Sequence, residues 1–182
     1  MKIIAAGDLH GHTTQAKQLV EAVEREGADK VILLGDMLYQ GVYGKITEDF
    51  SGPDTKDILN SLADKIIAVR GNCDAEVHQE FLHYPMMADI GGLGEVTRAI
   101  YFTQGHLYNQ HSLPAMAEGD VLLQGHTHIP AWVCTDGRYV FNPGSMAHDK
   151  EGNIKGYLLI EDGKTFIWKT MEGEEYHREE LK

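Results

Sequence analysis

Five short apolar segments of the sequence end in the same way, with a glycine followed by a residue that can bind a metal ion. These endings are Ala5-Ala6-Gly7-Asp8, Leu33-Leu34-Gly35-Asp36, Val69-Arg70-Gly71-Asn72, Thr103-Gln104-Gly105-His106 and Leu123-Gln124-Gly125-His126. One such ending is commonplace, because glycine often follows a strand, but five of them are hard to assign to chance. In open α/β sheets, ligands bind at the carboxyl ends of the strands. We therefore expect these side chains to meet at one edge of a sheet.

Two more histidines extend the set, because His10 follows Asp8 and His128 follows His126 at a spacing of two residues. In an extended chain this spacing places both side chains on the same face. Seven nitrogen and oxygen ligands are too many for one ordinary metal ion and suit two ions that share a bridging carboxylate. The absence of thiolates from the set favours Mn²⁺, Fe, Ni²⁺ or Zn²⁺ over a structural cysteine–zinc site, and the imidazoles argue against Ca²⁺. The candidate metal ligands are Asp8, His10, Asp36, Asn72, His106, His126 and His128.

The elements that must position these residues alternate in the first part of the chain. Apolar runs predict strands at 2–7, 31–34 and 66–69, and apolar periodicity predicts helices at 15–26 and 55–63, with a loop at 39–53. Thr13 or Thr14 is expected to cap the first helix, and Asp54 or Thr55 the second. Strands that alternate with helices predict a parallel sheet.

The second part of the chain is richer in predicted antiparallel strands. Strands are expected at 100–103 and 121–123, with a short helical stretch near 112–117 between them. Asp136-Gly137 and Asp162-Gly163 are strong hairpin turns, and they predict strand pairs at 131–135 with 139–141 and at 157–160 with 165–168. The charged tail, 172–182, is expected to be solvated.

Length and charge restrict the class of protein. The chain has 182 residues and two cysteines, which predicts one domain over 1–182 without a disulfide framework. Its 16 basic and 28 acidic residues give a net charge of −12, which argues against an extensive nucleic-acid surface and against an anionic membrane. No apolar run approaches the ~20 residues of a membrane span, and the apolar start is too short for a signal peptide. We therefore expect a cytoplasmic protein, and its oligomeric state stays open.

In their order along the chain, the motifs Asp-x-His, Gly-Asp, Gly-Asn-x-Asp, Gly-His and Gly-His-Thr-His resemble those of the calcineurin-like metallophosphoesterases, and of small bacterial YfcE-type phosphodiesterases in particular. The resemblance covers about residues 1–160. It implies an α/β fold, a four-layer αββα sandwich of two mixed β-sheets.

The resemblance also implies roles for the candidate ligands. Asp8, His10, Asp36 and His128 would hold one ion, and Asp36, Asn72, His106 and His126 the other, with Asp36 as the bridge. Such an enzyme hydrolyses its substrate by attack of a metal-bridging hydroxide on phosphorus. Mn²⁺ is the expected ion.

One departure from the wider superfamily concerns proton donation. Many members have a histidine after the asparagine as the proposed donor to the leaving group, whereas this chain has Cys73. A thiol is a weak hydrogen-bond donor and a poorer general acid than an imidazolium. Cys73 and Asp74 are nevertheless candidate catalytic residues beside Asn72 and Asp36, and His12 is an alternative donor or a substrate-binding residue. A buried packing role for Cys73 and a turn or cap role for Asp74 are the alternatives.

A second departure concerns the substrate. Protein Ser/Thr phosphatases of the superfamily carry Gly-Asp-x-x-Asp-Arg-Gly, but residues 35–41 here lack that Asp and Arg. Without a fixed guanidinium, selection for a dianionic monoester is weaker, so a small phosphodiester is the expected substrate. Arg70 is a candidate phosphate contact, and a structural ion pair is its alternative. A phosphomonoesterase, a nucleotide pyrophosphatase, and a non-catalytic scaffold like the retromer subunit of this fold are the other functions that fit.

Overall fold

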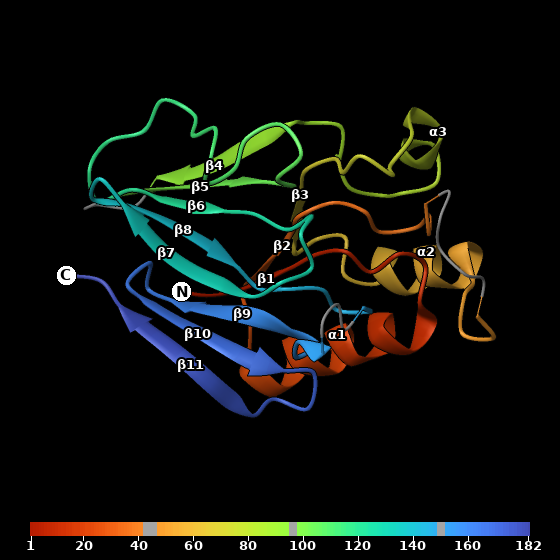
Figure 1. Ribbon diagram of the computed structural model, residues 1–182. Helices are drawn as coiled ribbons and strands as arrows, with labels where there is room; N and C mark the ends of the chain where they lie inside the picture. Colours follow the sequence, from red (N-terminus) through yellow and green to blue (C-terminus); the bar gives the residue numbers. More distant parts are fainter. Residues whose placement is uncertain (42–46, 95–97, 149–151) are drawn as a thin grey trace.

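Two β-sheets packed face to face form the centre of the molecule, with helices on one side (Figure 1). The computed structural model describes residues 1–41, 47–94, 98–148 and 152–182. Three helices are defined within this part of the chain: α1 (Thr13–Glu26), α2 (Gly52–Asn60) and α3 (Glu76–Gln79). None of them has the length and apolar character needed to cross a bilayer.

The first sheet combines parallel and antiparallel strands. Its strands are β1 (Lys2–Ala6), β2 (Lys30–Leu33), β3 (Ile66–Ala68), β9 (Gly156–Glu161), β10 (Thr165–Thr170) and β11 (Glu175–Glu180). They lie in the order β11-β10-β9-β1-β2-β3. The pairs β1–β2 and β2–β3 are parallel, as the alternation of strands and helices predicted, and the other pairs are antiparallel.

The second sheet is also mixed. Its strands are β4 (Ile90–Gly94), β5 (Ala99–Thr103), β6 (Val121–Leu123), β7 (Ala131–Thr135) and β8 (Arg138–Asn142), in the order β4-β5-β6-β8-β7. Both predicted hairpins form, and Asp136 and Asp162 begin their turns at a φ of 50°. The expectation of an α/β fold with two mixed sheets is therefore confirmed.

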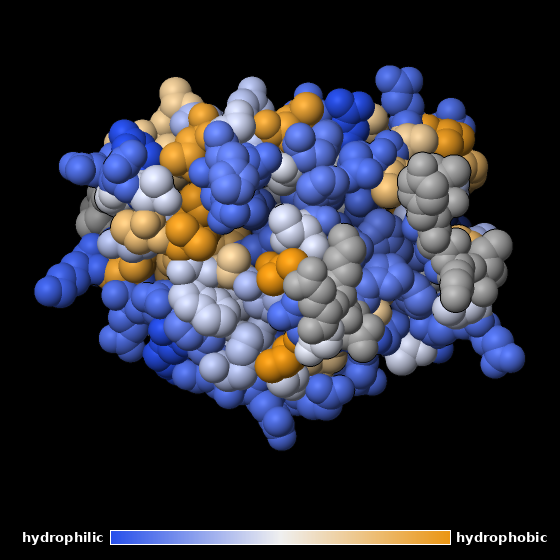
Figure 2. All heavy atoms as spheres, in the orientation of Figure 1, coloured by the Kyte–Doolittle hydropathy of each residue, from blue (hydrophilic) through white to orange (hydrophobic). Residues whose placement is uncertain are grey.

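Two apolar clusters hold the layers together. One lies between the helices and the first sheet, where α1 buries Ala16, Leu19 and Val23 against strand residues such as Ile4. The other lies between the two sheets and includes Trp168. On the face shown in Figure 2 the surface is mainly hydrophilic, as the net charge suggests.

The helix starts differ from the prediction. His12 is the N-cap of α1 and makes no capping bond with its side chain; Asp49 instead accepts hydrogen bonds from the backbone and hydroxyl of Thr14. Helix α2 starts at Gly52, inside the predicted loop, and Ser51 accepts a hydrogen bond from the backbone N–H of Asp54. Residues 42–46 of that loop lie outside the described part of the chain.

Three segments correct the predicted secondary structure. The stretch 112–117 is irregular instead of helical, because Asn109 and Ser112 form an isolated bridge and Arg138 binds the carbonyl of Met116. The tail forms β11, an edge strand whose following residue, Leu181, is 7% exposed. Strand β4 escaped prediction because its glycines resemble a turn. In the part of the chain that the structure describes, no long helix lies beyond the second sheet.

A buried carboxylate couples α1 to the first sheet. Glu26 Oε1 accepts hydrogen bonds from Tyr157 Oη at 2.6 Å and Lys169 Nζ at 2.7 Å, and Arg25 Nε lies 3.6 Å away. Burial alone would raise the pKa of Glu26, but these partners lower it below its ordinary value of 4.5. Because the pKa is lower in the folded chain, the group stabilises the fold above about pH 4.5 and loses this effect as the pH falls further.

We expect Glu26→Gln to lower the free energy of unfolding by about 2 kcal/mol at pH 7, because it leaves the partly buried ammonium of Lys169 without its charged partner. Urea denaturation of both proteins at pH 7 and pH 4 measures this, and the difference should shrink at the lower pH. The control is Glu175→Gln, which breaks the ion pair between Glu175 and Arg178. The side chains of these two residues are 43% and 41% exposed. The control substitution should change stability by less than about 0.5 kcal/mol. A pH-independent difference for Glu26→Gln would contradict this account.

Candidate metal centre

The predicted strand ends meet at one end of the sandwich, away from the two chain termini (Figure 1). Hydrogen bonds join the segments that follow the strands. Asp8 Oδ2 accepts from the backbone N–H of His126 at 2.9 Å, which links β1 of one sheet to β6 of the other. Asp36 Oδ1 accepts from the backbone N–H of Cys73 at 2.7 Å, which links β2 to β3.

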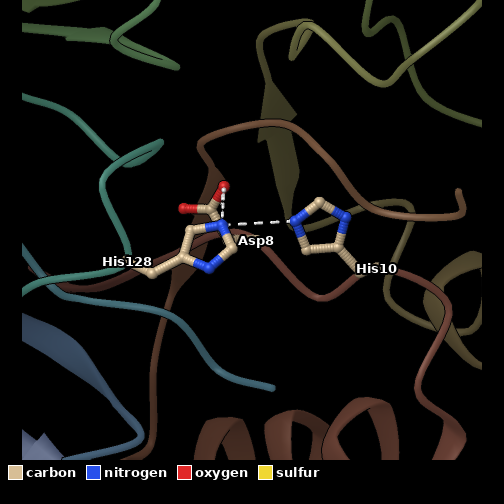
Figure 3. A group of neighbouring side chains, drawn as sticks. All are labelled: Asp8, His10 and His128. Atoms are coloured by element: carbon tan, nitrogen blue, oxygen red, sulfur yellow. Dashed lines mark hydrogen bonds and ion pairs between the residues drawn. The ribbon is translucent and has the colours of Figure 1, made fainter. Parts of the chain in front are cut away.

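Asp8, His10 and His128 form the tightest group of candidate ligands. Figure 3 shows the two imidazoles pointing toward each other beside the carboxylate. His10 Nε2 lies 3.3 Å from His128 Nε2, and His128 Nε2 lies 3.4 Å from Asp8 Oδ1. Asp36 Oδ2 lies 3.9 Å from His10 Nε2. Atoms of Asp8, His10 and His128 that can bind a metal all lie within 4.8 Å of one another.

The contacts of this group fit a bound cation. His10 Nδ1 lies 2.8 Å from the carbonyl oxygen of Tyr39, which can only accept, so that Nδ1 carries the proton and Nε2 of the neutral ring has a lone pair. This lone pair faces the second imidazole at 3.3 Å. Asp8 Oδ1 and His128 Nδ1 are buried and have no hydrogen-bond partner among the described residues. A shared positive charge would satisfy the facing atoms, and nitrogen with carboxylate oxygen suits a transition metal ion.

The backbone itself is unusual at these positions. Among the described residues, seven non-glycine residues have a positive φ, and two of them are the hairpin aspartates. The other five are candidate ligands: Asp8, His10, Asp36, His126 and His128, with φ between 51° and 66°. The left-handed backbone conformation is energetically costly for residues other than glycine, and residues that adopt it cluster at functional sites.

Asp36 is held between two segments. Its Oδ1 accepts from Cys73, and Gln104 Nε2 lies 3.5 Å from its Oδ2. Burial raises the pKa of Asp36, and the charges of Asp8 and Asp74 add to this effect, although the hydrogen bond from Cys73 opposes it. A buried carboxylate beside two others is the arrangement that a bound cation stabilises.

Asp74 supports Asp36 from behind, and its carboxylate is fully buried. Its Oδ2 accepts from the backbone N–H groups of Asp36 at 2.7 Å and Gly71 at 2.9 Å, and its Oδ1 from Met37 at 3.2 Å. Burial would raise the pKa of Asp74, but the neighbouring ring of His78 and the hydrogen bonds from these backbone groups lower it. The geometry favours a positioning role for Asp74 over direct contact with a substrate.

We expect Asp74→Asn to lower the melting temperature and to weaken metal binding. Both oxygens of Asp74 accept hydrogen bonds from backbone N–H groups, and the amide nitrogen of asparagine would place a second donor against one of these N–H groups. A loss of about 1–3 kcal/mol of stability is typical for such a mismatch. Thermal unfolding and equilibrium dialysis with Mn²⁺ measure the two effects. If the variant were less stable but bound Mn²⁺ with unchanged affinity, Asp74 would stabilise the fold without orienting Asp36 as a metal ligand.

Cys73 lies within reach of the same centre. Metal-binding atoms of His10, Asp36 and Cys73 lie within 4.8 Å of one another, and Asn72 Nδ2 donates to Cys73 Sγ at 3.3 Å. Burial, followed by the charge of Asp36, raises the pKa of Cys73 to about 12. In this environment the group is a protonated thiol at neutral pH. The side chain of Asn72 itself is exposed.

His106 and His126 form a wider group than the first. Their ring centres are 6.3 Å apart, compared with 5.2 Å for His10 and His128. The buried side chain of Gln104 joins them, with Oε1 at 2.7 Å from His106 Nδ1 and Nε2 at 3.1 Å from His126 Nδ1. An oxygen that accepts from Nδ1 leaves His106 Nε2 as the metal-binding atom.

Of the two candidate substrate contacts, Arg70 is engaged in an ion pair and His12 is engaged only through Nδ1. Arg70 donates from Nε and Nη2 to Asp89 Oδ1 at 2.9 and 2.7 Å, which is the ion pair considered as its alternative. His12 Nδ1 lies 3.5 Å from Asp49 Oδ2, and its buried Nε2 has no hydrogen-bond partner in the described chain. Burial lowers the pKa of His12 in spite of Asp49.

Sequence reasoning missed three positions. His148 matches no motif, yet its half-buried ring is parallel to that of His128 at 5.4 Å and lies 5.2 Å from that of His10. Gln104 carried a signal, because Gln-Gly-His occurs twice in the sequence, but its contacts depend on the tertiary fold. Ser145 Oγ donates to the carbonyl of Asp8 at 2.7 Å and accepts from the backbone N–H of His148 at 3.0 Å.

Asn142, the last residue of β8, also supports the candidate site. Its buried amide donates to the carbonyl of Gly125 and to Thr127 Oγ1, and its Oδ1 accepts from Gly144. These bonds fix the segment that carries His126 and His128.

The imidazoles around the centre are suited to bind metal. Burial lowers the pKa of His106 and of His126, and burial with the neighbouring His10 and His128 lowers the pKa of His148 to about 4. These rings are neutral at physiological pH, and the neutral ring is the form that coordinates a metal ion. The fold and this site together define a two-sheet α/β protein with a candidate metal centre at its strand ends.

Comparison with known proteins assigns the chain to a family. The model of the calcineurin-like phosphoesterase superfamily domain matches residues 1–164. The phosphodiesterase YfcE of Escherichia coli K12 is 36% identical over 162 residues, which cover 89% of this chain and 88% of YfcE. The chain therefore belongs to the calcineurin-like phosphoesterase superfamily and is a homologue of YfcE.

Solved structures agree with this assignment. The structure of the E. coli phosphoesterase YfcE superposes with a TM-score of 0.95 at 32% identity, over 100% of both chains. An archaeal phosphodiesterase superposes with a TM-score of 0.66 at 21% identity, again over 100% of both chains, and this likeness concerns the fold.

Proposed function

We propose that this protein, acting as one domain over residues 1–182, is a binuclear-metal phosphodiesterase that hydrolyses a small phosphodiester. The observation that carries the proposal is the group of Asp8, His10 and His128, whose metal-binding atoms lie together at the strand ends, with Asp8 Oδ1 lacking a hydrogen-bond partner in the described chain. Membership of the superfamily and the identity to the phosphodiesterase YfcE support the reaction class.

The ligands divide into two groups that share Asp36. Asp8, His10, Asp36 and His128 would hold one ion, and Asp36, Asn72, His106 and His126 the other, with Mn²⁺ as the expected metal. When bound, the two ions would supply an activated water and the positive charge that phosphodiester hydrolysis needs.

The chain's own contacts orient this ligand set. The carbonyl of Tyr39 keeps the proton of His10 on Nδ1, and Gln104 Oε1 keeps that of His106 on Nδ1. In both neutral rings Nε2 is then the unprotonated nitrogen that can coordinate a metal ion. His12 is the candidate proton donor or substrate contact next to this set, and Cys73 is the candidate that replaces the usual histidine.

The charges around the centre favour a diester over a monoester. The guanidinium of Arg70 is paired with Asp89, so its Nε and Nη2 donors are not available for bidentate binding of a dianionic phosphate. Asp8, Asp36 and Asp74 are buried nearby and repel additional negative charge. A phosphodiester carries one negative charge and is repelled less.

The test is hydrolysis of bis(p-nitrophenyl) phosphate and of p-nitrophenyl phosphate by metal-stripped protein, with and without Mn²⁺, together with elemental analysis. We expect two ions per chain, activity that returns with Mn²⁺, and faster turnover of the diester. Preference for the monoester would favour a phosphomonoesterase. A protein with two bound ions that hydrolyses neither compound would favour a non-catalytic scaffold.

A further inference from the structure

A cleft of about 370 Å³ opens between α2 and α3. Its walls include Leu38, Tyr39, Pro53, Lys56, His78 and Phe81. Figure 2 shows apolar atoms gathered over α3, at the upper right of the molecule. The volume is within the range of sites that hold a small organic group.

The walls suit an uncharged, planar occupant. Tyr39 and Phe81 are 45% and 54% exposed, which leaves aromatic surface available for contact. The ammonium of Lys56 is paired with Asp57 Oδ1 at 2.6 Å. His78 Nδ1 accepts from the backbone N–H of Ala75 at 3.2 Å. The polar wall residues are therefore engaged with the protein, and aromatic surface is left for a ligand.

The cleft and the metal centre share one segment of backbone. Residues 36–39 carry Asp36 at one end and two wall residues, Leu38 and Tyr39, at the other. The carbonyl of Tyr39 also binds His10 Nδ1 at 2.8 Å. On the opposite wall, His78 Nδ1 lies 3.6 Å from Asp74 Oδ1, the carboxylate that supports Asp36. One wall therefore contacts the candidate ligand His10 directly through Tyr39, and the other wall is connected to Asp36 through His78 and Asp74.

We propose that this cleft binds an aromatic ester group of the phosphodiester substrate, such as an aryl ring or a nucleobase. The inference rests on the proposed function, because the metal centre must hold the phosphate while the cleft holds the ring. It predicts selectivity for aromatic over small alkyl phosphate esters.

Binding of methyl phenyl phosphate and of dimethyl phosphate, two phosphodiesters, to the Mn²⁺-loaded protein tests the proposal and is measured by calorimetry. We expect the wild type to bind methyl phenyl phosphate about tenfold more tightly, since an aromatic contact contributes about 1.4 kcal/mol. Phe81→Ala should reduce this preference at least threefold and leave the affinity for dimethyl phosphate unchanged. Phe81→Tyr keeps the ring and should retain the preference.

Val77→Ala is the matched control, because Val77 lies on α3, is 51% exposed and is not part of the cleft wall. It should leave both affinities unchanged. Equal affinity of the wild type for the two ligands would overturn the cleft assignment and leave the proposed metal centre unaffected. Binding of neither would overturn the proposed function and this inference with it. Dissociation of an oligomer by Phe81→Ala without any change in preference would make the cleft an interface and also overturn the proposal.

Discussion

Asp36→Asn is expected to reduce metal-dependent phosphodiester hydrolysis by about 10³-fold, because the substitution weakens the carboxylate that both ions would share. Asparagine has the same shape and tolerates the left-handed backbone that Asp36 adopts at a φ of 56°. The loss should therefore come from charge and not from the fold. Activity with Mn²⁺, bound metal by elemental analysis and circular dichroism measure the three properties.

Asp136→Asn provides the matched control for this substitution. Asp136 is also left-handed, at a φ of 50°, but it is exposed in the hairpin turn between β7 and β8. The same chemical change there should alter neither metal content nor activity. If well-folded, metal-loaded Asp36→Asn protein kept near-normal activity, the assignment of the bridging ligand would be wrong.

Gly71→Ala should damage the centre without removing any candidate ligand. A Cβ atom at this position would lie 2.0 Å from Asp36 Oδ1 and 2.5 Å from the backbone nitrogen of Asp36. Asp36 cannot retreat easily, because Asp74 binds its backbone N–H and Cys73 binds its side chain. Relief of these contacts requires Asp36 to move, and a shift of about 1 Å at a reacting centre typically lowers the rate about 10²-fold. Overpacking should also lower stability by about 1–3 kcal/mol.

Gly92→Ala controls for the loss of a glycine from the same fold. A Cβ atom at Gly92, in β4, would meet Tyr101 at 3.6 Å, an ordinary contact distance. We expect near-normal metal affinity and activity in this variant. Equilibrium dialysis with Mn²⁺ compares the two proteins, and equal affinities would show that close packing at Gly71 does not position Asp36.

The strand-end residues were the part of the site most open to prediction from sequence. A buried parallel strand is an apolar run, and a glycine after it marks the sharp exit, so that Asp8 and Asp36 are placed by local pattern alone. The meeting of His126 with Asp8 needed one more rule, that carboxyl ends of strands share an edge. The structure brings these residues together as that rule expects.

Contacts between distant segments could not be predicted in the same way. Asp49 binds the start of α1 from 35 residues away in sequence, where the local pattern pointed to Thr13 or Thr14 as the cap. His148 joins the centre because Ser145 holds its backbone, and no spacing in the sequence shows that bond. Strand β11 differs from the predicted solvated tail. As an edge strand it pairs with one neighbouring strand and needs few apolar residues, so its many charged residues mask the strand pattern around Tyr176.

The left-handed backbone of the five candidate ligands has a further consequence for the binding of metal ions. This backbone shape is built by glycines, strand ends and buried hydrogen bonds that form when the chain folds, so the candidate ligands are preorganised. An incoming ion would then have little conformational entropy to remove, and its intrinsic affinity would not be diminished by reorganisation. In return, ion binding would stabilise a folded state that carries this backbone strain. Under the proposed function, metal supply and resistance to unfolding would thus be coupled in one thermodynamic cycle.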